Sequence, residues 1–161
     1  MDTLHALRAP IFNIVNGSFV DGYGIRTTIF LKGCPLRCKW CCNPEGQAFP
    51  PQLRWLESHC RPGCGNCIEA CPRHAVSRQG ERLVIDRTRC DDCGSCVDSC
   101  WYDALGMYGT WYTPEELMPR ILREKPYMED SGGGLTIGGG EATCWPAFCR
   151  TLIRLCHEEG I

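Results

Sequence analysis

Cysteines dominate the chemistry available to this chain, which has 15 of them in 161 residues. The segment GCPLRCKWCCNPEGQ (33–47) places four cysteines within nine positions, two of them adjacent. No signal-peptide pattern and no long apolar run is visible, so we expect a cytoplasmic protein without a membrane segment. In a reducing compartment, dense and regularly spaced cysteines ligate metal or carry out redox chemistry rather than form disulfides. The odd cysteine count also argues against a disulfide scaffold.

Eleven of the cysteines fall into three groups by spacing. The groups are Cys34, Cys38 and Cys41; Cys60, Cys64, Cys67 and Cys71; and Cys90, Cys93, Cys96 and Cys100. The second and third groups form an internal repeat at an offset of 29 residues, each reading C-x2-C-x3-C-x3-A followed by an aliphatic residue. This is the run of two-cluster bacterial ferredoxins, in which the fourth cysteine of each run ligates the other cluster.

The crossing pattern predicts two [4Fe–4S] clusters. One would be held by Cys60, Cys64, Cys67 and Cys100, and the other by Cys71, Cys90, Cys93 and Cys96. The first run departs from the pattern by opening C-x3-C, and Trp101 stands where the second run would usually have proline. The alternative is a pair of zinc sites with four cysteine ligands each, but three close cysteines and a fourth after x3 suit zinc less well. The segment AVSRQGERLVID (75–86) between the runs predicts a β-hairpin.

The first group supplies only three thiolates. A cubane held by three protein ligands leaves one iron open to an exogenous ligand, and an open coordination position is typical of a catalytic site. Cys42 could be a fourth ligand, but it adjoins Cys41, and neighbouring residues rarely reach one small cluster without strain. We therefore expect Cys42 to be packed in the loop or to lie near substrate.

Four segments together resemble a known family. CPLRCKWC resembles the signature of radical S-adenosylmethionine (SAM) enzymes, and DGYGIRTTIFLKGC (21–34) looks like the opening of glycyl-radical enzyme activating enzymes. WCCNPEGQ and SGGGLTIGGGEAT (131–143) are similar to further motifs of that family, in the same order. The sequence departs from those motifs at Tyr23 for proline, Gly138 for serine, and Ala142-Thr143 for proline-leucine.

The resemblance implies a cofactor set and a reaction. Cys34, Cys38 and Cys41 would hold a third, catalytic [4Fe–4S] cluster that binds SAM, with Trp40, Gly139, Gly140 and Glu141 as further cofactor contacts. Reductive cleavage of SAM would yield a 5′-deoxyadenosyl radical that takes hydrogen from a glycine of a partner glycyl-radical enzyme. No side chain need act as acid or base, because the cofactor does the chemistry. Ferredoxin or flavodoxin would donate electrons through the other two clusters, in an anaerobe.

Two rival functions remain open. The chain could be an electron carrier, with a functional ferredoxin-like segment and a vestigial barrel, or a radical SAM enzyme acting on a small molecule. A nucleic-acid partner is not expected, since the net charge is −2 with both signs interspersed.

The elements that position these motifs are readable in part. RTTIFLKG and GLTIGG predict strands, and PAFCRTLIRLCHEEG predicts an amphipathic helix in which Cys149 and Cys156 are interior thiols. TPEELMPRILREKP predicts a helix opened by a Thr113–Glu116 capping box, with a kink at Pro119 and a stop at Pro126. Chemistry-bearing loops that follow strands indicate the βα-barrel class.

The predicted organisation is α/β, with a ferredoxin-like α+β insert in a partial (βα)6 radical SAM barrel. Residues 1–48 would begin the barrel with the cluster loop, 49–107 would form the two-cluster insert, and 108–161 would continue the barrel. Only two barrel strands are predicted, so we expect an N-terminal fragment of a longer protein.

Overall fold

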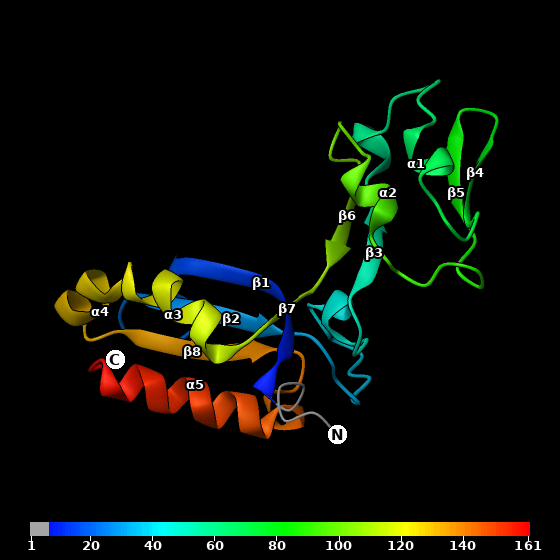
Figure 1. The fold of residues 1–161 in the computed structure, drawn as a ribbon. Helices are drawn as coiled ribbons and strands as arrows, with labels where there is room; N and C mark the ends of the chain where they lie inside the picture. Colours follow the sequence, from blue (N-terminus) through cyan, green and yellow to red (C-terminus); the bar gives the residue numbers. More distant parts are fainter. Residues whose placement is uncertain (1–6) are drawn as a thin grey trace. The chain divides into compact units, whose positions relative to one another are not determined.

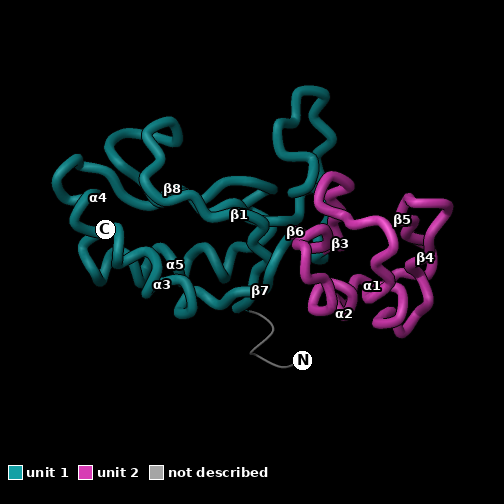
Figure 2. Tube along the Cα trace, turned by 90° about the horizontal axis from the view of Figure 1, so that it is seen from above, with its two compact units in different colours: residues 1–51, 109–161 teal, residues 52–108 magenta. Residues whose placement is uncertain are grey.

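The computed structural model describes residues 7–161, which form two compact units. One unit joins the segment up to Pro51 with Gly109–Ile161, and the other is Gln52–Tyr108 (Figure 2). The chain therefore leaves the first unit and returns to it after 57 residues (52–108). Within residues 7–161, no helix has the length and apolar character needed to cross a membrane. The fold is mixed α/β.

The first unit is built on a four-stranded sheet with the order β7-β1-β2-β8 (Figure 1). Its strands are β1 (Ala9–Ser18), β2 (Arg26–Leu31), β7 (Thr110–Tyr112) and β8 (Gly134–Gly139). β1 pairs antiparallel with both β2 and β7, whereas β2 and β8 are parallel and in register from Arg26↔Gly134 to Leu31↔Gly139. The predicted strands at 26–31 and 134–139 are confirmed. The sheet also contains β1 and β7, which pair antiparallel and which the sequence analysis did not predict.

Three helices complete the first unit, namely α3 (Pro114–Leu122), α4 (Lys125–Ser131) and α5 (Pro146–Glu158). α3 and α5 lie side by side along one side of the sheet (Figure 2). Their apolar stripes bury Leu117 and Ile121 from α3, and Phe148 and Leu152 from α5, against Ile29 of β2. This packing stabilises the two parallel strands on which the candidate site depends.

The structure confirms the start of the predicted 113–126 helix and corrects its end. The Thr113 hydroxyl accepts from the Glu116 amide and the Glu116 carboxylate accepts from the Thr113 amide, so the capping box is present. α3 passes through Pro119 without a break and ends at Leu122. Pro126 does not stop a helix; it lies in the first turn of α4, where a proline needs no amide donor.

The second unit contains β3 (Gln52–Trp55), α1 (Asn66–Glu69), β4 (Val76–Gln79), β5 (Arg82–Ile85), α2 (Ser95–Asp98) and β6 (Leu105–Tyr108). β4 and β5 form the predicted hairpin, and β3 pairs antiparallel with β6. The 29-residue repeat of the cysteines extends to the strands that follow them, because β4 begins at Val76 and β6 begins 29 residues later, at Leu105. Both residues are buried in a core that also contains Leu53 and Leu83.

Candidate iron–sulfur sites

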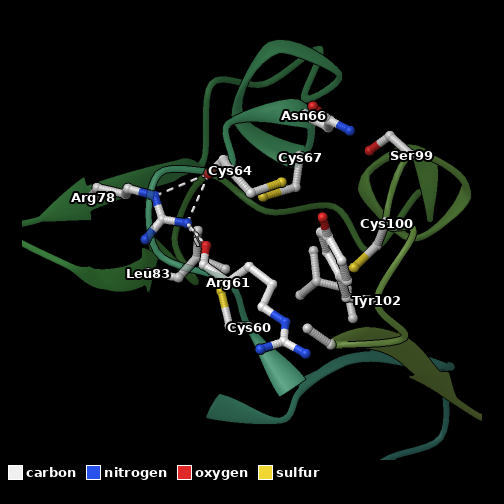
Figure 3. Close-up of a pocket in the computed structure, with 12 residues that line it drawn as sticks. Cys60, Arg61, Cys64, Asn66, Cys67, Arg78, Leu83, Ser99, Cys100 and Tyr102 are labelled. Atoms are coloured by element: carbon white, nitrogen blue, oxygen red, sulfur yellow. Dashed lines mark hydrogen bonds between the residues drawn. The ribbon is translucent and has the colours of Figure 1, made fainter. Parts of the chain in front are cut away.

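The second unit gathers its eight thiols around two cavities, the first of which is shown in Figure 3. This first cavity is lined by the thiols of Cys60, Cys64, Cys67 and Cys100. The second cavity is lined by the thiols of Cys71, Cys90, Cys93 and Cys96. Each set takes three cysteines from one run and one from the other, and these are the sets that the sequence pattern assigns to separate clusters. Four thiols around one cavity suit a [4Fe–4S] cluster.

Burial and repulsion from neighbouring thiols favour the protonated form of two buried cysteines, Cys67 and Cys96. Burial, followed by the nearby Cys64, Cys100 and Cys60 thiols, raises the pKa of Cys67. Burial raises the pKa of Cys96 to about 11, with Cys71 as the next contribution. A cluster needs all four of its ligands as thiolates, so binding it would release protons. Within residues 7–161, no three His, Cys, Asp or Glu side chains already converge on a point that fits one bare metal ion.

Arg78 is the residue of the first cavity that the sequence analysis missed. It extends from β4 toward the segment between Cys60 and Cys64 (Figure 3). Its guanidinium donates to the carbonyl oxygens of Cys64 at 2.7 and 3.1 Å and of Arg61 at 2.9 Å. An arginine in a hairpin strand carries no spacing signal, so only the three-dimensional arrangement identifies it.

The three-cysteine group lies in the first unit, in the loop 33–47 that follows β2, which we call the cysteine loop. Cys34 is half-buried, while Cys38 and Cys41 are exposed. Backbone bonds from Gly33 to Gly46 (2.7 Å) and from Cys34 to Gln47 (3.0 Å) close the base of the loop. Cys42 is exposed, so the expectation that it is packed in the loop is wrong. Trp40 is also exposed, with 84% of its surface accessible.

The predicted Gly139–Glu141 segment, here the GGE element, lies against the base of the cysteine loop. The Gly140 amide donates to the Leu31 carbonyl at 2.6 Å, and the Glu141 amide donates to the Gly33 carbonyl at 2.9 Å. The contact follows from the register of β2 and β8, since parallel strands that end together place their following loops together. The loop thiols and the GGE element therefore share one end of the sheet.

Contacts within the chain account for the glycines and the carboxylate of the GGE element. A Cβ on Gly139 would lie 2.7 Å from the Leu31 amide, and one on Gly140 would lie 2.5 Å from the Gly33 carbonyl oxygen. The Glu141 carboxylate accepts from the amide and hydroxyl of Thr143 at 3.0 and 2.8 Å. These two bonds, the amide first, lower the pKa of Glu141 and keep it ionised. Glycine is needed here because β2 approaches so closely.

Lys32 also supports the cysteine loop, although the sequence analysis overlooked it. The residue is fully buried, and its ammonium group donates to the Glu45 carbonyl at 2.5 Å. Its own carbonyl accepts from the Trp145 indole at 2.8 Å, and its amide donates to the Pro10 carbonyl at 2.7 Å. The signal in the sequence was a lysine inside the apolar run IFLKG, where a charged side chain is buried only with partners.

The DGYGIRT and SGGG segments lie at the opposite end of the strands, where β2 and β8 begin. The Ile25 amide donates to the Ser131 hydroxyl at 2.8 Å, and the Arg26 guanidinium donates to the Leu135 carbonyl at 2.6 Å. The Asp21 carboxylate accepts from Ser18 (2.7 Å) and Thr28, and these bonds, Ser18 first, lower the pKa of Asp21. In this chain the two segments join β2 to β8.

Comparison with known proteins defines the class first. Residues 59–104 match the model of the family described as 4Fe-4S dicluster domain. That range contains all eight thiols of the two cavities. The chain therefore contains a ferredoxin-like iron–sulfur domain.

Relatives with assigned names then show what the chain as a whole is similar to. The isethionate sulfite-lyase activating enzyme of Oleidesulfovibrio alaskensis is 42% identical over 93% of this chain and 50% of its own length. The indoleacetate decarboxylase activating enzyme of Tractidigestivibacter scatoligenes is 39% identical over 95% of this chain and 51% of its own. The choline trimethylamine-lyase activating enzyme of O. alaskensis is 41% identical over 96% and 50%. These homologues are thus activating enzymes of lyases and of a decarboxylase, and the chain spans about half their length.

Proposed function

We propose that the chain is part of a glycyl-radical enzyme activating enzyme. The observation that carries the proposal is the hydrogen-bonded contact between the cysteine loop and the GGE element at one end of the sheet. The named relatives support it, since they match the chain over more than nine-tenths of its length. We place residues 1–48 and 108–161 in a partial (βα)6 radical SAM barrel and residues 49–107 in its two-cluster insert.

The proposed cofactors are three [4Fe–4S] clusters and SAM. Cys34, Cys38 and Cys41 would hold the catalytic cluster, while the four thiols of each cavity would hold one cluster of the insert. When bound and reduced, the catalytic cluster would supply one electron to cleave a C–S bond of SAM, giving methionine and a 5′-deoxyadenosyl radical that would take a hydrogen atom from a glycine of the partner enzyme. Gly139, Gly140, Glu141 and Trp40 would bind and orient SAM. The exposure of Cys38 and Cys41 supports this role, since a ligand could reach a cluster that they held.

The partners in this proposal are a glycyl-radical enzyme as protein substrate and a ferredoxin or flavodoxin as electron donor. A cytoplasmic location belongs to the proposal, because dense and regularly spaced cysteines in a reducing compartment ligate metal. The rival function is an electron carrier that uses only the insert. It is favoured by the eight thiols that already line two cavities, in contrast to the exposed thiols of the cysteine loop.

Anaerobic reconstitution of the chain separates the two functions. Three cubanes correspond to about twelve irons per chain, with an EPR spectrum of the reduced protein that changes on adding SAM. About eight irons and no response to SAM would favour the electron carrier. Cys41→Ser is expected to remove about four irons and the response to SAM. Cys42→Ser, its neighbour, is the matched control and is expected to retain both; equal losses in the two variants would contradict the ligand assignment.

A further inference from the structure

The first cavity contains a clamp made by one side chain. The guanidinium of Arg78, besides its bonds to Cys64 and Arg61, donates to the Glu81 carbonyl at 2.6 Å. Its Nη2 also lies 3.8 Å from the Cys60 sulfur. One half-buried cation therefore holds the backbone around two thiols of the cavity and faces the sulfur of one of them.

The clamp lies where the first cysteine run departs from the usual spacing. Cys60 and Cys64 enclose three residues, whereas Cys90 and Cys93 enclose two. The longer segment has one more backbone carbonyl, and Arg78 donates to a carbonyl within it, that of Arg61. The guanidinium of Arg78 donates to this carbonyl and to that of Cys64 with a planar fork of N–H groups, which a lysine could not reproduce.

The second cavity presents the opposite charge at the corresponding sulfur. Cys90 is the first cysteine of its run, as Cys60 is of the other, and its sulfur lies 3.8 Å from the Asp92 Oδ1. Asp91 also lines this cavity and is paired with Arg73 at 2.8 Å. Arg73 lines the second cavity too, and the Arg87 guanidinium lies 3.8 Å from the same Asp92 oxygen. The first cavity, in contrast, has Arg61 and Arg78 in its wall and, among the described residues that line it, no carboxylate to balance them.

We propose that Arg78 is a positioning residue for the cluster of the first cavity and makes it the more easily reduced cluster of the two. The inference rests on the cluster assignment proposed above. The potential of an iron–sulfur cluster depends on nearby charge and on hydrogen bonds to its sulfurs. Reduction adds a negative charge, so a cation beside Cys60 favours the reduced state and a carboxylate beside Cys90 disfavours it. An electron shared by the pair therefore rests mainly on the first-cavity cluster.

Potentiometric EPR titration of the full chain tests the proposal. Cys34, Cys38 and Cys41 are replaced by serine throughout, so that only the two clusters of the insert report. Arg78→Met is expected to shift the reduction equilibrium of one cluster at least tenfold toward the oxidised form, about 59 mV for one electron. The other cluster keeps its potential. Arg82→Met is the matched control, since Arg82 lies on the same hairpin but lines neither cavity.

Two further variants separate charge from shape. Arg78→Lys retains a cation but loses the fork, so it should restore part of the potential while iron is lost faster to a chelator than in the parent. Asp92→Asn should raise the potential of the second cluster only. The inference is overturned, while the cluster assignment stands, if Arg78→Met and Arg78→Lys both have the same reduction potentials and the same rates of iron loss as Arg82→Met. A parent chain that binds no iron at the eight thiols would overturn the cluster assignment, and the inference with it.

Discussion

Substitution of Gly140 by alanine should detach the GGE element from the cysteine loop. The added Cβ would lie 2.5 Å from the Gly33 carbonyl oxygen and 3.0 Å from that of Leu31, and both of these neighbours are backbone atoms. Leu31 is paired with strands on both sides, and Gly33 is bonded to Gly46, so neither atom can move away alone and the new methyl group separates the two segments. The amide bonds from Gly140 to Leu31 and from Glu141 to Gly33 are then lost.

The magnitude follows from these two effects. Two backbone hydrogen bonds contribute about 1–3 kcal/mol together, at roughly 0.5–1.5 kcal/mol each. Steric strain at a packed position adds about 1–3 kcal/mol. Together they give a local destabilisation of about 2–6 kcal/mol, which corresponds to a roughly 30- to 20,000-fold loss of protection, at tenfold per 1.4 kcal/mol.

Hydrogen–deuterium exchange of the full chain measures this loss directly. Uptake should rise in peptides that cover residues 31–47 and 139–145 and stay unchanged in those from 52–108. Gly138→Ser is the matched control, because a Cβ on Gly138 meets nothing within 4 Å. Equal protection of the Glu141 amide in the Gly140→Ala and Gly138→Ser variants would refute the reasoning.

Three further outcomes are expected. Burial raises the pKa of Cys156 to about 11 from 9.0, so its neutral form stabilises the fold below pH 9 and that contribution is lost as the pH rises toward 11. Between pH 8 and pH 10.5, the free energy of unfolding measured with urea should therefore fall further for the parent than for Cys156→Ala. Equal falls in the two proteins would exclude this origin. Lys32→Met removes the buried donor to the cysteine loop and should speed loss of iron from that loop to a chelator, whereas the exposed control Lys39→Met should not; equal rates would disprove the support. Thr113→Ala removes the capping box and should lower the free energy of unfolding by about 1 kcal/mol, measured by urea denaturation, and a change below about 0.3 kcal/mol would argue against the cap.

The sequence was informative where a local pattern has a single physical cause. Apolar β-branched runs predicted β2 and β8, and the capping box predicted the start of α3. The hairpin at 76–85 followed from two short apolar runs around a glycine turn. The spacing of the repeat also anticipated which thiols the fold brings around each cavity, because such spacing reflects a twofold arrangement of the chain.

Long-range structure was not readable in the same way. β1 escaped prediction because its pairing with β2 shifts register at Ile11/Asn13 and again at Val15/Ser18, which breaks the alternation of buried and exposed residues. α4 was missed because Pro126 signals a stop as readily as a first turn. Lys32 and Arg78 both donate to backbone carbonyls. Every residue has a backbone carbonyl, so the sequence does not indicate which one a side chain will reach.

The backbone contact between the cysteine loop and the GGE element has a thermodynamic consequence. Gly33 accepts from Glu141 and also donates to Gly46 in the cysteine loop, so neither segment can become ordered or disordered alone. Whatever ligand fixes one segment lowers the entropy cost of fixing the other, which is positive coupling without any change of shape. Such coupling is reciprocal, so each ligand would tighten the binding of the other by the same factor.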